Sequence, residues 1–311
     1  MDDFETKIME KLKDKNLADS SINFYLRNLR KLNGNKELKN LNFLNKKDSI
    51  DELIKTKKAN TQRNYYISIV SVLNTDEKKK TLTNYYRQKM DTMNKDLKKI
   101  EGENEKTETQ KKNWITKEEI DNIYNKYKDE VNKFKNDKTI SSAKFGKLLK
   151  YVVLSLYILI PPRRNKDYQE AYIIKGMNEK DLDDDLNYVD ITNKKFIFNN
   201  FKTVKSEGEQ KIDIPNDLMD VLNIYIKFHP LIEGNEKKYD VPFLVNSEGI
   251  PLPSVNSLTL LLNRIFNKNI GCSMLRHLYL SNKYGNLLNE QKEDAKKMGH
   301  SVEMQKDYIK K

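Results

Sequence analysis

The feature that most constrains the fold is a segment of sixteen residues, 98–113, that contains almost no apolar side chains. It consists almost entirely of Lys, Glu, Asn, Thr and Gln. A segment of this composition cannot bury enough apolar surface to offset the entropy lost on ordering. Regularly spaced apolar residues lie on both sides of it, and 311 residues are enough for two domains. We therefore expect a domain at 1–100, a linker at 101–113 and a second domain at 114–311.

The first domain is predicted to be a helical bundle. Apolar residues recur at helical spacing in three stretches: Ile22, Tyr25, Leu26, Leu29 and Leu32; Tyr66, Ile69, Val70 and Leu73; Tyr86, Met90, Met93 and Leu97. Ser20 or Ser21 can cap the first of these helices, and Gly34 can end it. Lysines and arginines surround all three stretches, so we expect the bundle to have a basic face.

The second domain combines helices with short strands. Thr116 and Glu119 have the spacing of a capping box, which predicts a helix that starts there. A more apolar helix is expected at about 142–160. Three short runs then change to the pattern of strands: 188–192, 195–199 and 211–214. The fold class predicted is α+β, mainly α, with a small antiparallel sheet in the second domain.

Composition restricts the class of function. The net charge is +12 with a pI near 9.3, which favours a polyanionic partner, although a bias toward Lys and Asn is an equally simple explanation. The longest apolar run, 151–162, is too short to span a bilayer, and the first residues lack the features of a signal peptide, so we expect an intracellular protein. With one cysteine, three histidines without metal-ligand spacing and no glycine-rich loop, we expect no metal and no cofactor.

Four segments could carry chemistry. They are Pro161–Pro162–Arg163–Arg164, Phe201–Lys202–Thr203, Ser273–Met274–Leu275–Arg276–His277, and Met298–Gly299–His300–Ser301 followed by Tyr308. Arginine presents a planar fork of donors that suits a phosphate. Each segment alone also has a structural interpretation, such as a solvated helix end, a surface lysine or a loose tyrosine near a terminus.

Taken in order, the residues Arg164, Lys202, Arg276, His300 and Tyr308 resemble the signature of the tyrosine recombinase, or phage integrase, family. Leu275–Arg276–His277 and Gly299–His300–Ser301 are similar to its local motifs. The resemblance covers about residues 115–311 and is strongest to integrases of virophages and large DNA viruses. It implies a DNA breaking-rejoining fold, an N-terminal core-binding domain, and a virus-encoded protein that acts in the host nucleus or a viral factory.

The resemblance also implies a role for each residue. Arg164 and Arg276 would hold the non-bridging oxygens of a DNA phosphate, and Lys202 would protonate the departing 5′-oxygen. Tyr308 would attack the phosphorus to form a 3′-phosphotyrosyl bond, with help from His300. Weaker assignments to substrate binding fall on three further residues, Arg163, Ser273 and His277. The partners implied are double-stranded DNA and further copies of the chain, as a tetramer on DNA.

Three departures from the family pattern are present. Ser273 stands where many members have histidine, and the interval from His300 to Tyr308 is one residue shorter than usual. The chain ends three residues after Tyr308, so we expect either assembly through a surface other than a C-terminal helix or a chain that has been trimmed. Two alternatives remain, a related topoisomerase that relaxes supercoils and a non-catalytic DNA-binding descendant of the family.

Three other residues are expected to be structural. His229 precedes Pro230, which predicts a surface turn, and Tyr279 and Tyr284 are expected in the core.

Overall fold

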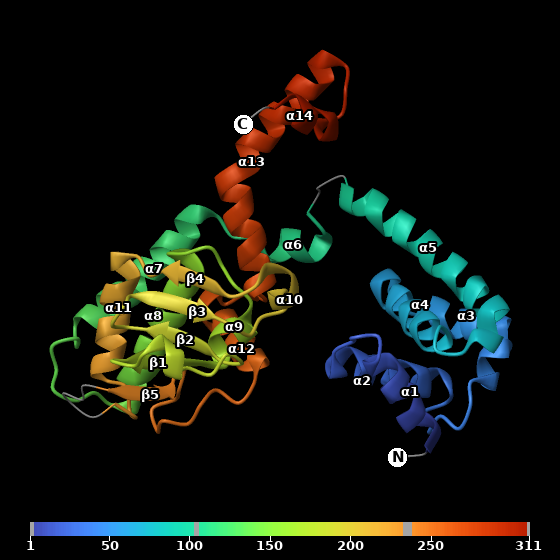
Figure 1. Cartoon of the computed structure of the whole chain (residues 1–311). Coiled ribbons are helices and arrows are strands. Elements are labelled where there is room, and N and C mark those ends of the chain that lie inside the picture. Colours follow the sequence, from blue (N-terminus) through green and yellow to red (C-terminus); the bar gives the residue numbers. More distant parts are fainter. Residues whose placement is uncertain (1–2, 103–105, 233–237, 310–311) are drawn as a thin grey trace. The chain divides into compact units, whose positions relative to one another are not determined.

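The computed structural model describes residues 3–102, 106–232 and 238–309, and the chain forms two compact units. Unit 1 is Met1–Lys106 and unit 2 is Thr107–Lys311. In the described ranges no helix combines the length and the apolar character needed to cross a membrane. The chain is mainly helical, with a single small mixed sheet among the described residues (Figure 1).

In its described residues, unit 1 consists of helices joined by short turns and loops and contains no strand. Its elements are α1 Asp3–Lys13, α2 Asp19–Leu32, η1 Asn42–Asn45, α3 Lys47–Lys55, α4 Ala59–Leu73, η2 Glu77–Lys79 and α5 Lys80–Gly102. The apolar faces of α2 and α4 pack together, with Leu29, Ile69 and Leu73 fully buried. The three helices predicted from periodicity are confirmed. The predicted serine cap is wrong, because α2 begins at Asp19 and Ala18 occupies the N-cap position.

The buried carboxylate of Asp51 makes several polar contacts in the interior of unit 1. Asp51 accepts hydrogen bonds from the hydroxyls of Tyr66, at 3.0 Å, and Tyr85, at 2.7 Å, and pairs with Lys89 at 3.1 Å. The hydrogen bond to Asp51 raises the pKa of Tyr85, and burial raises the pKa of Tyr66 well above its usual value. These tyrosines remain neutral and serve the fold.

Unit 2 contains the sheet and most of the buried core. Its helices are α6 Glu108–Asn113, α7 Lys117–Asn132, α8 Ser142–Ile158, α9 Asn165–Gln169, η3 Glu179–Asp181, α10 Val204–Glu207, α11 Asn216–Lys227, α12 Val255–Phe266, α13 Cys272–Met298 and α14 Val302–Tyr308. The central helix is α8, which packs against α7, α11 and α12. The capping box of Thr116 and Glu119 is present at the start of α7, as predicted.

The sheet has five strands in the order β4-β3-β2-β1-β5. Its strands are β1 Ala171–Lys175, β2 Asn187–Asp190, β3 Lys195–Phe198, β4 Gln210–Asp213 and β5 Tyr239–Pro242. The expectation of an antiparallel sheet is wrong, because β1 and β2 run parallel while the other pairs are antiparallel. The chain returns from the end of β1 to the start of β2 through η3, and that return makes the pair parallel.

Several local expectations also need correction. Part of the expected linker forms α6, which opens with a capping box of Thr107 and Gln110. His229 is buried, with 2% of its surface exposed, and is not a surface turn residue. Its Nε2 lies 3.1 Å from the carbonyl oxygen of Pro242. Tyr284 is 45% exposed and therefore does not belong to the core.

The longest element of unit 2 is α13, with 27 residues. Its first turns are anchored by Met274, Leu275 and Leu278, which are buried. Beyond them a row of apolar side chains is exposed: Leu280, Tyr284, Leu287 and Leu288. In Figure 1 this second part of α13 leads away from the sheet and ends at α14. We call residues 280–309 the arm.

Candidate functional site

A pocket of about 330 Å³ is lined by all three predicted arginines. Its walls come from the loop that follows α8, from the β3–α10–β4 hairpin and from the start of α13. Arg163, Arg164 and Arg276 all line it, together with hairpin residues such as Phe201 and Gln210. Residues far apart in the sequence therefore form one cationic cavity, which we call the arginine pocket.

Two prolines place Arg164 at the pocket. Helix α8 ends at Ile158, and a helix cannot continue through Pro161 and Pro162, which lack backbone N–H groups and constrain the residues before them. Arg164 follows with an extended backbone and occupies the N-cap position of α9. It is half-buried, and in the described part of the chain no hydrogen bond or ion pair engages its guanidinium.

Arg276 reaches the same pocket from α13. The buried residues Met274, Leu275 and Leu278 attach the first turns of α13 to the core, and Arg276 lies on the exposed side of those turns. Over the described residues its guanidinium has no acidic partner either. Two uncommitted guanidinium groups facing one cavity are suited to bind an anion such as a phosphate.

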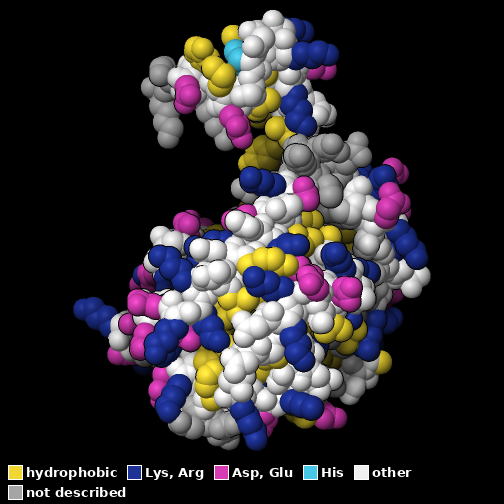
Figure 2. Space-filling model, turned by 90° about the vertical axis from the view of Figure 1, so that its right-hand side faces the viewer, with side chains coloured by type: hydrophobic (Ala, Val, Ile, Leu, Met, Phe, Trp, Pro, Cys, Tyr) yellow, Lys and Arg dark blue, Asp and Glu magenta, His cyan; other side chains and the backbone are white. Residues whose placement is uncertain are grey.

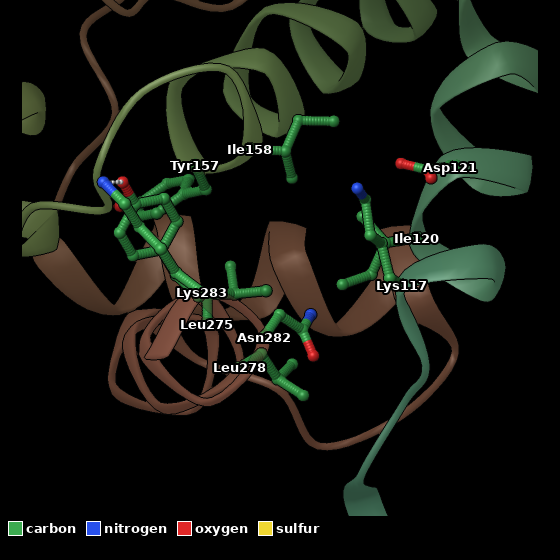
Figure 3. A pocket seen from close by; sticks show the side chains of 10 residues that line it. Lys117, Ile120, Asp121, Tyr157, Ile158, Leu275, Leu278, Asn282 and Lys283 are labelled. Atoms are coloured by element: carbon green, nitrogen blue, oxygen red, sulfur yellow. Dashed lines mark hydrogen bonds between the residues drawn. The ribbon is translucent and has the colours of Figure 1, made fainter. Parts of the chain in front are cut away.

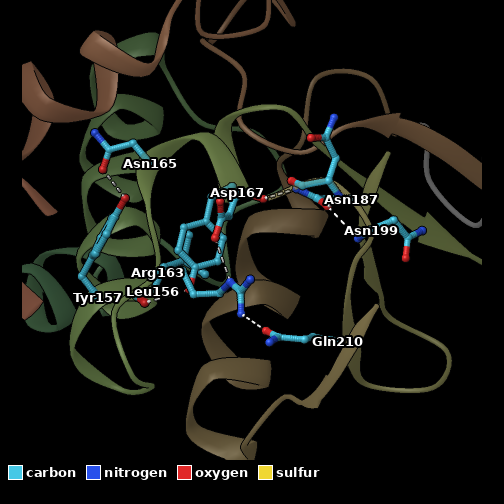
Figure 4. Close-up of polar contacts among 10 residues, drawn as sticks. Leu156, Tyr157, Arg163, Asn165, Asp167, Asn187, Asn199 and Gln210 are labelled. Atoms are coloured by element: carbon cyan, nitrogen blue, oxygen red, sulfur yellow. Dashed lines mark hydrogen bonds and ion pairs between the residues drawn. The ribbon is translucent and has the colours of Figure 1, made fainter. Parts of the chain in front are cut away.

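Arg163 differs from the other two arginines because protein groups occupy its side chain. It pairs with Asp167 at 3.0 Å and donates a hydrogen bond of 2.7 Å to Gln210 (Figure 4). Its guanidinium lies 3.7 Å from the ring centre of Phe198 and 4.9 Å from that of Phe201. The side chain is 13% exposed. The weaker assignment of Arg163 to substrate binding would require it to leave these partners.

Lys202 stands on the hairpin beside the pocket. Its neighbours Phe201 and Thr203 line the cavity, while Lys202 itself is exposed. The structure therefore brings Lys202 to the rim, with its flexible side chain in solvent. Ser273 and His277 are exposed one turn apart on α13 and do not line the pocket.

His300 and Tyr308 form a second group on the arm. Gly299 ends α13 with a φ of +73°, a conformation that favours glycine, and Ser301 caps α14 by accepting from the N–H of Met304. This turn stacks the ring of His300 on that of Tyr308, with ring centres 5.5 Å apart. Within the described residues the Nε2 atom of His300 is buried and has no hydrogen-bond partner. Tyr308 is 64% exposed.

The structure does not bring the two groups together. A helix rises about 1.5 Å per residue, so the 27 residues of α13 span about 40 Å. Arg276 lies in the second turn of α13, and His300 lies two residues beyond its last residue, Met298. The five predicted residues thus form an arginine pocket with Lys202 at its rim, and a distant pair on the arm.

A second pocket, of about 350 Å³, lies at the base of the arm between α7, α8 and α13 (Figure 3). Its walls are largely apolar and include Ile120, Ile158 and Leu278, with Lys117 and Lys283 at the edge. None of the residues predicted from the motifs lines it. The arginine pocket is therefore the better candidate for anion chemistry.

Neither a metal-binding cluster in the described ranges nor a dominant basic patch on the face drawn in Figure 2 indicates another functional site. Among the described residues, no group of three or more His, Cys, Asp or Glu side chains could hold a metal ion. On the face drawn in Figure 2, lysines and arginines are spread among acidic side chains. The net charge of +12 is therefore not gathered at one place on that face.

Sequence reasoning missed the residues that shape the arginine pocket. Asp167 and Gln210 hold Arg163, and Asn165 accepts a hydrogen bond of 2.6 Å from Tyr157 while donating to Thr259. The spacing of Arg163 and Asp167, four residues apart across the start of α9, was the signal available.

Comparisons with known proteins returned no matching family model, no matching curated protein and no matching solved structure.

Proposed function

We propose that this chain is a tyrosine recombinase that cleaves and rejoins double-stranded DNA through a 3′-phosphotyrosyl intermediate, with the DNA breaking-rejoining fold in unit 2. The observation that carries the proposal is the arginine pocket. Arg164 and Arg276 come from distant parts of the sequence, line one cavity and are uncommitted in the described structure. The motif order that led to these residues supports the same reaction.

In the proposed reaction the pocket stabilises charge on the phosphate. The Tyr308 oxygen attacks the phosphorus and loses its proton, which His300 or water accepts. Arg164 and Arg276 hold the non-bridging oxygens, where negative charge increases in the transition state. The bond from phosphorus to the 5′-oxygen breaks, and Lys202 protonates that oxygen to release a 5′-hydroxyl end. Attack by a 5′-hydroxyl reverses these steps and rejoins the strand without an energy source.

The distance between the arm and the pocket requires that Tyr308 be delivered. We propose that the arm of one copy supplies His300 and Tyr308 to the arginine pocket of another copy on the same DNA. An unbroken α13 of 27 residues keeps Tyr308 away from its own pocket, and the exposed apolar row on the arm provides a surface for another copy to cover. The assembly would be a tetramer on two duplexes, as in the family resembled.

Covalent capture tests the reaction. The probe is a pool of nicked duplexes with a randomised centre, in which a short fragment next to the nick diffuses away after cleavage and traps the intermediate. We expect the wild-type chain to form adducts that resist SDS, and Tyr308→Phe to form none. Tyr284→Phe, at an exposed tyrosine of the arm on α13, is the matched control, and because it keeps the apolar ring it should behave as wild type.

The same assay separates the alternatives. A wild type that binds the pool but forms no adduct would identify a non-catalytic DNA-binding protein, the alternative that the distance between Tyr308 and the pocket favours. Adducts at unrelated sequences with relaxation of supercoiled plasmid would identify a topoisomerase.

A mixing experiment tests delivery between copies. Arg276→Ala keeps the arm and loses the pocket, whereas Tyr308→Phe keeps the pocket and loses the nucleophile. Tyr308→Phe alone should form no adduct, and Arg276→Ala alone should form adducts about 10²–10³-fold more slowly than wild type. Their mixture should form adducts faster than Arg276→Ala alone, and only with the Arg276→Ala copy, identified by a size tag. A wild type that is active while the mixture is no faster than Arg276→Ala alone would show that the arm serves its own pocket.

A further inference from the structure

We infer that Arg163 is a positioning residue, whose task is to hold the hairpin that carries Lys202 over the arginine pocket. The inference rests on the proposed function and names a residue for which that reaction has no direct role. What carries it is the set of contacts that Arg163 makes, which join one hairpin, through Phe198, Phe201 and Gln210, to Asp167 on α9.

The hairpin residues that Arg163 contacts lie on both sides of Lys202 in the sequence. Its Nη1 donates to Gln210, the first residue of β4, and its guanidinium lies over Phe198, the last residue of β3. The same guanidinium faces Phe201, the residue before Lys202. Arginine suits this arrangement because its plane can stack on aromatic rings while its edge donates hydrogen bonds. The exit and the return of the hairpin are thus both held by one side chain.

The other side of Arg163 is fixed to the loop that presents Arg164. Asp167 on α9 pairs with Arg163 at 3.0 Å, and both side chains are largely buried. Because buried charges are costly unless paired, this contact holds Arg163 in one orientation. Arg163 therefore connects the segment that carries Arg164 to the segment that carries Lys202 and holds the two at a fixed spacing.

A buried asparagine makes a second link between the same two segments. The side-chain oxygen of Asn187 accepts from the backbone N–H groups of Asn199, at 2.9 Å, and Asn200, at 2.8 Å. Its amide nitrogen donates to the backbone oxygens of Asn200 and Asp167 (Figure 4). Two independent connections therefore join the exit from β3 to α9. The geometry fixes the base of the Lys202 segment and leaves the lysine side chain free to reach a phosphate.

This role has a chemical signature that separates it from phosphate binding. A general acid is needed only because the departing 5′-oxygen is a strong base. When the bridging 5′-oxygen is replaced by sulfur, the leaving thiolate is a much weaker base and needs no proton. A residue that acts through Lys202 becomes dispensable on the sulfur substrate, whereas a residue that holds the non-bridging oxygens does not.

The experiment compares adduct formation on duplexes with bridging oxygen and bridging sulfur, using a sequence selected from the randomised pool. The variants are Arg163→Gln, Gln210→Ala and Lys202→Ala, with Arg164→Ala as the control for phosphate binding. On oxygen we expect Arg163→Gln to be slower by about 10- to 100-fold, because small displacements of a catalytic group have effects of this size. On sulfur we expect Arg163→Gln and Lys202→Ala to come within about 3-fold of wild type, because the thiolate leaves without a general acid, and Arg164→Ala to stay slow.

Gln210→Ala keeps the inference testable if Arg163→Gln fails to fold. It removes the hairpin contact and leaves the pair of Arg163 and Asp167 intact. It should show the same rescue by sulfur with a smaller loss on oxygen, and add little to the loss in Arg163→Gln. Hydrogen exchange of residues 199–210 should increase in both variants.

The outcomes distinguish a failure of the positioning role from a failure of the proposed function. An active wild type with Arg163 and Gln210 variants that remain equally slow on sulfur would overturn the positioning role alone. A wild type that forms no adduct on either duplex would overturn the proposed function and this inference with it.

Discussion

The arginine pocket and the arm differ in how the fold holds them. The pocket is assembled on the buried core of unit 2, where Asp167, Gln210 and Asn187 fix its walls. The arm consists of the second part of α13, whose side chains are mostly exposed, and of α14, and His300 stacks on Tyr308 there through the turn at Gly299 and the short α14. The arginines proposed to stabilise charge are thus preorganised, while the proposed nucleophile lies on an element with few tertiary contacts. The difference teaches that the proposed binding and the proposed attack depend on separate parts of the fold.

The largest expected effect concerns the pocket. Arg164→Ala and Arg276→Ala should each slow adduct formation by about 10²–10³-fold, because each removes a preorganised donor to the transition state. Neither change should lower the melting temperature by more than a few degrees, since neither guanidinium has an acidic partner among the described residues. Rates on the captured duplex, with thermal melting as the control for folding, check this. A normal rate in both variants would remove the basis of the proposed function.

A comparable effect, on stability rather than on rate, concerns the wall of the pocket. Asp167→Ala leaves Arg163 buried without its partner and should lower the free energy of unfolding by about 3–5 kcal/mol. Lys166→Ala is the matched control, because Lys166 and Glu170 form an exposed pair with the same spacing, and it should cost less than about 1 kcal/mol. Urea unfolding followed by the fluorescence of Trp114, the one tryptophan, measures both. Equal costs would mean that the pocket wall is no more rigid than the surface.

A pH-dependent effect should be confined to the core. Burial lowers the pKa of His229 in the folded chain. The unfolded chain therefore takes up a proton first as the pH falls below about 6.5, and the free energy of unfolding decreases from there toward the lower folded pKa. His229→Gln should remove this component, which is obtained as the difference between wild type and variant across pH. His300→Gln should leave it in place, because the arm contributes little to the core that Trp114 reports.

The smallest expected effect lies on the arm. Leu287 is 53% exposed, so Leu287→Ser should change the free energy of unfolding of the isolated chain by less than about 0.5 kcal/mol. If another copy covers the arm, the same change should reduce adduct formation. A loss of several kcal/mol in the free chain would show that the arm belongs to the core, and the comparison above would fail.

Much of the fold could be predicted because its signals are local. The helix α8 is a long apolar stretch that ends at two prolines, and the capping box at Thr116 marks the start of α7. The strands β1 and β5 were missed because their pairing is not local. β1 follows α9 without turn residues, and β5 pairs with it from more than sixty residues away. The parallel pairing of β1 and β2 depends on that same tertiary arrangement.

The site was predictable only in part. The motifs named Arg164 and Arg276, and these lie at one pocket. No motif states whether α13 is continuous, and Gly285 in its middle could have broken it. The separation of Tyr308 from the pocket depends on that continuity, and so it emerged only from the structure. The hydrogen bond from Arg163 to Gln210 depends on how the hairpin folds, so it could not be predicted from the sequence either.

The stacking of His300 on Tyr308 has a consequence for any assembly of unequal copies. Both rings belong to the short segment 300–308, so in the proposed exchange one arm carries the proposed nucleophile and its proposed proton acceptor together. A pocket that receives a defective arm should then be fully inactive, and a pocket that receives an intact arm should be fully active. In mixtures of wild-type and defective chains, the yield should follow the fraction of intact arms in simple proportion, with no population of half-competent centres.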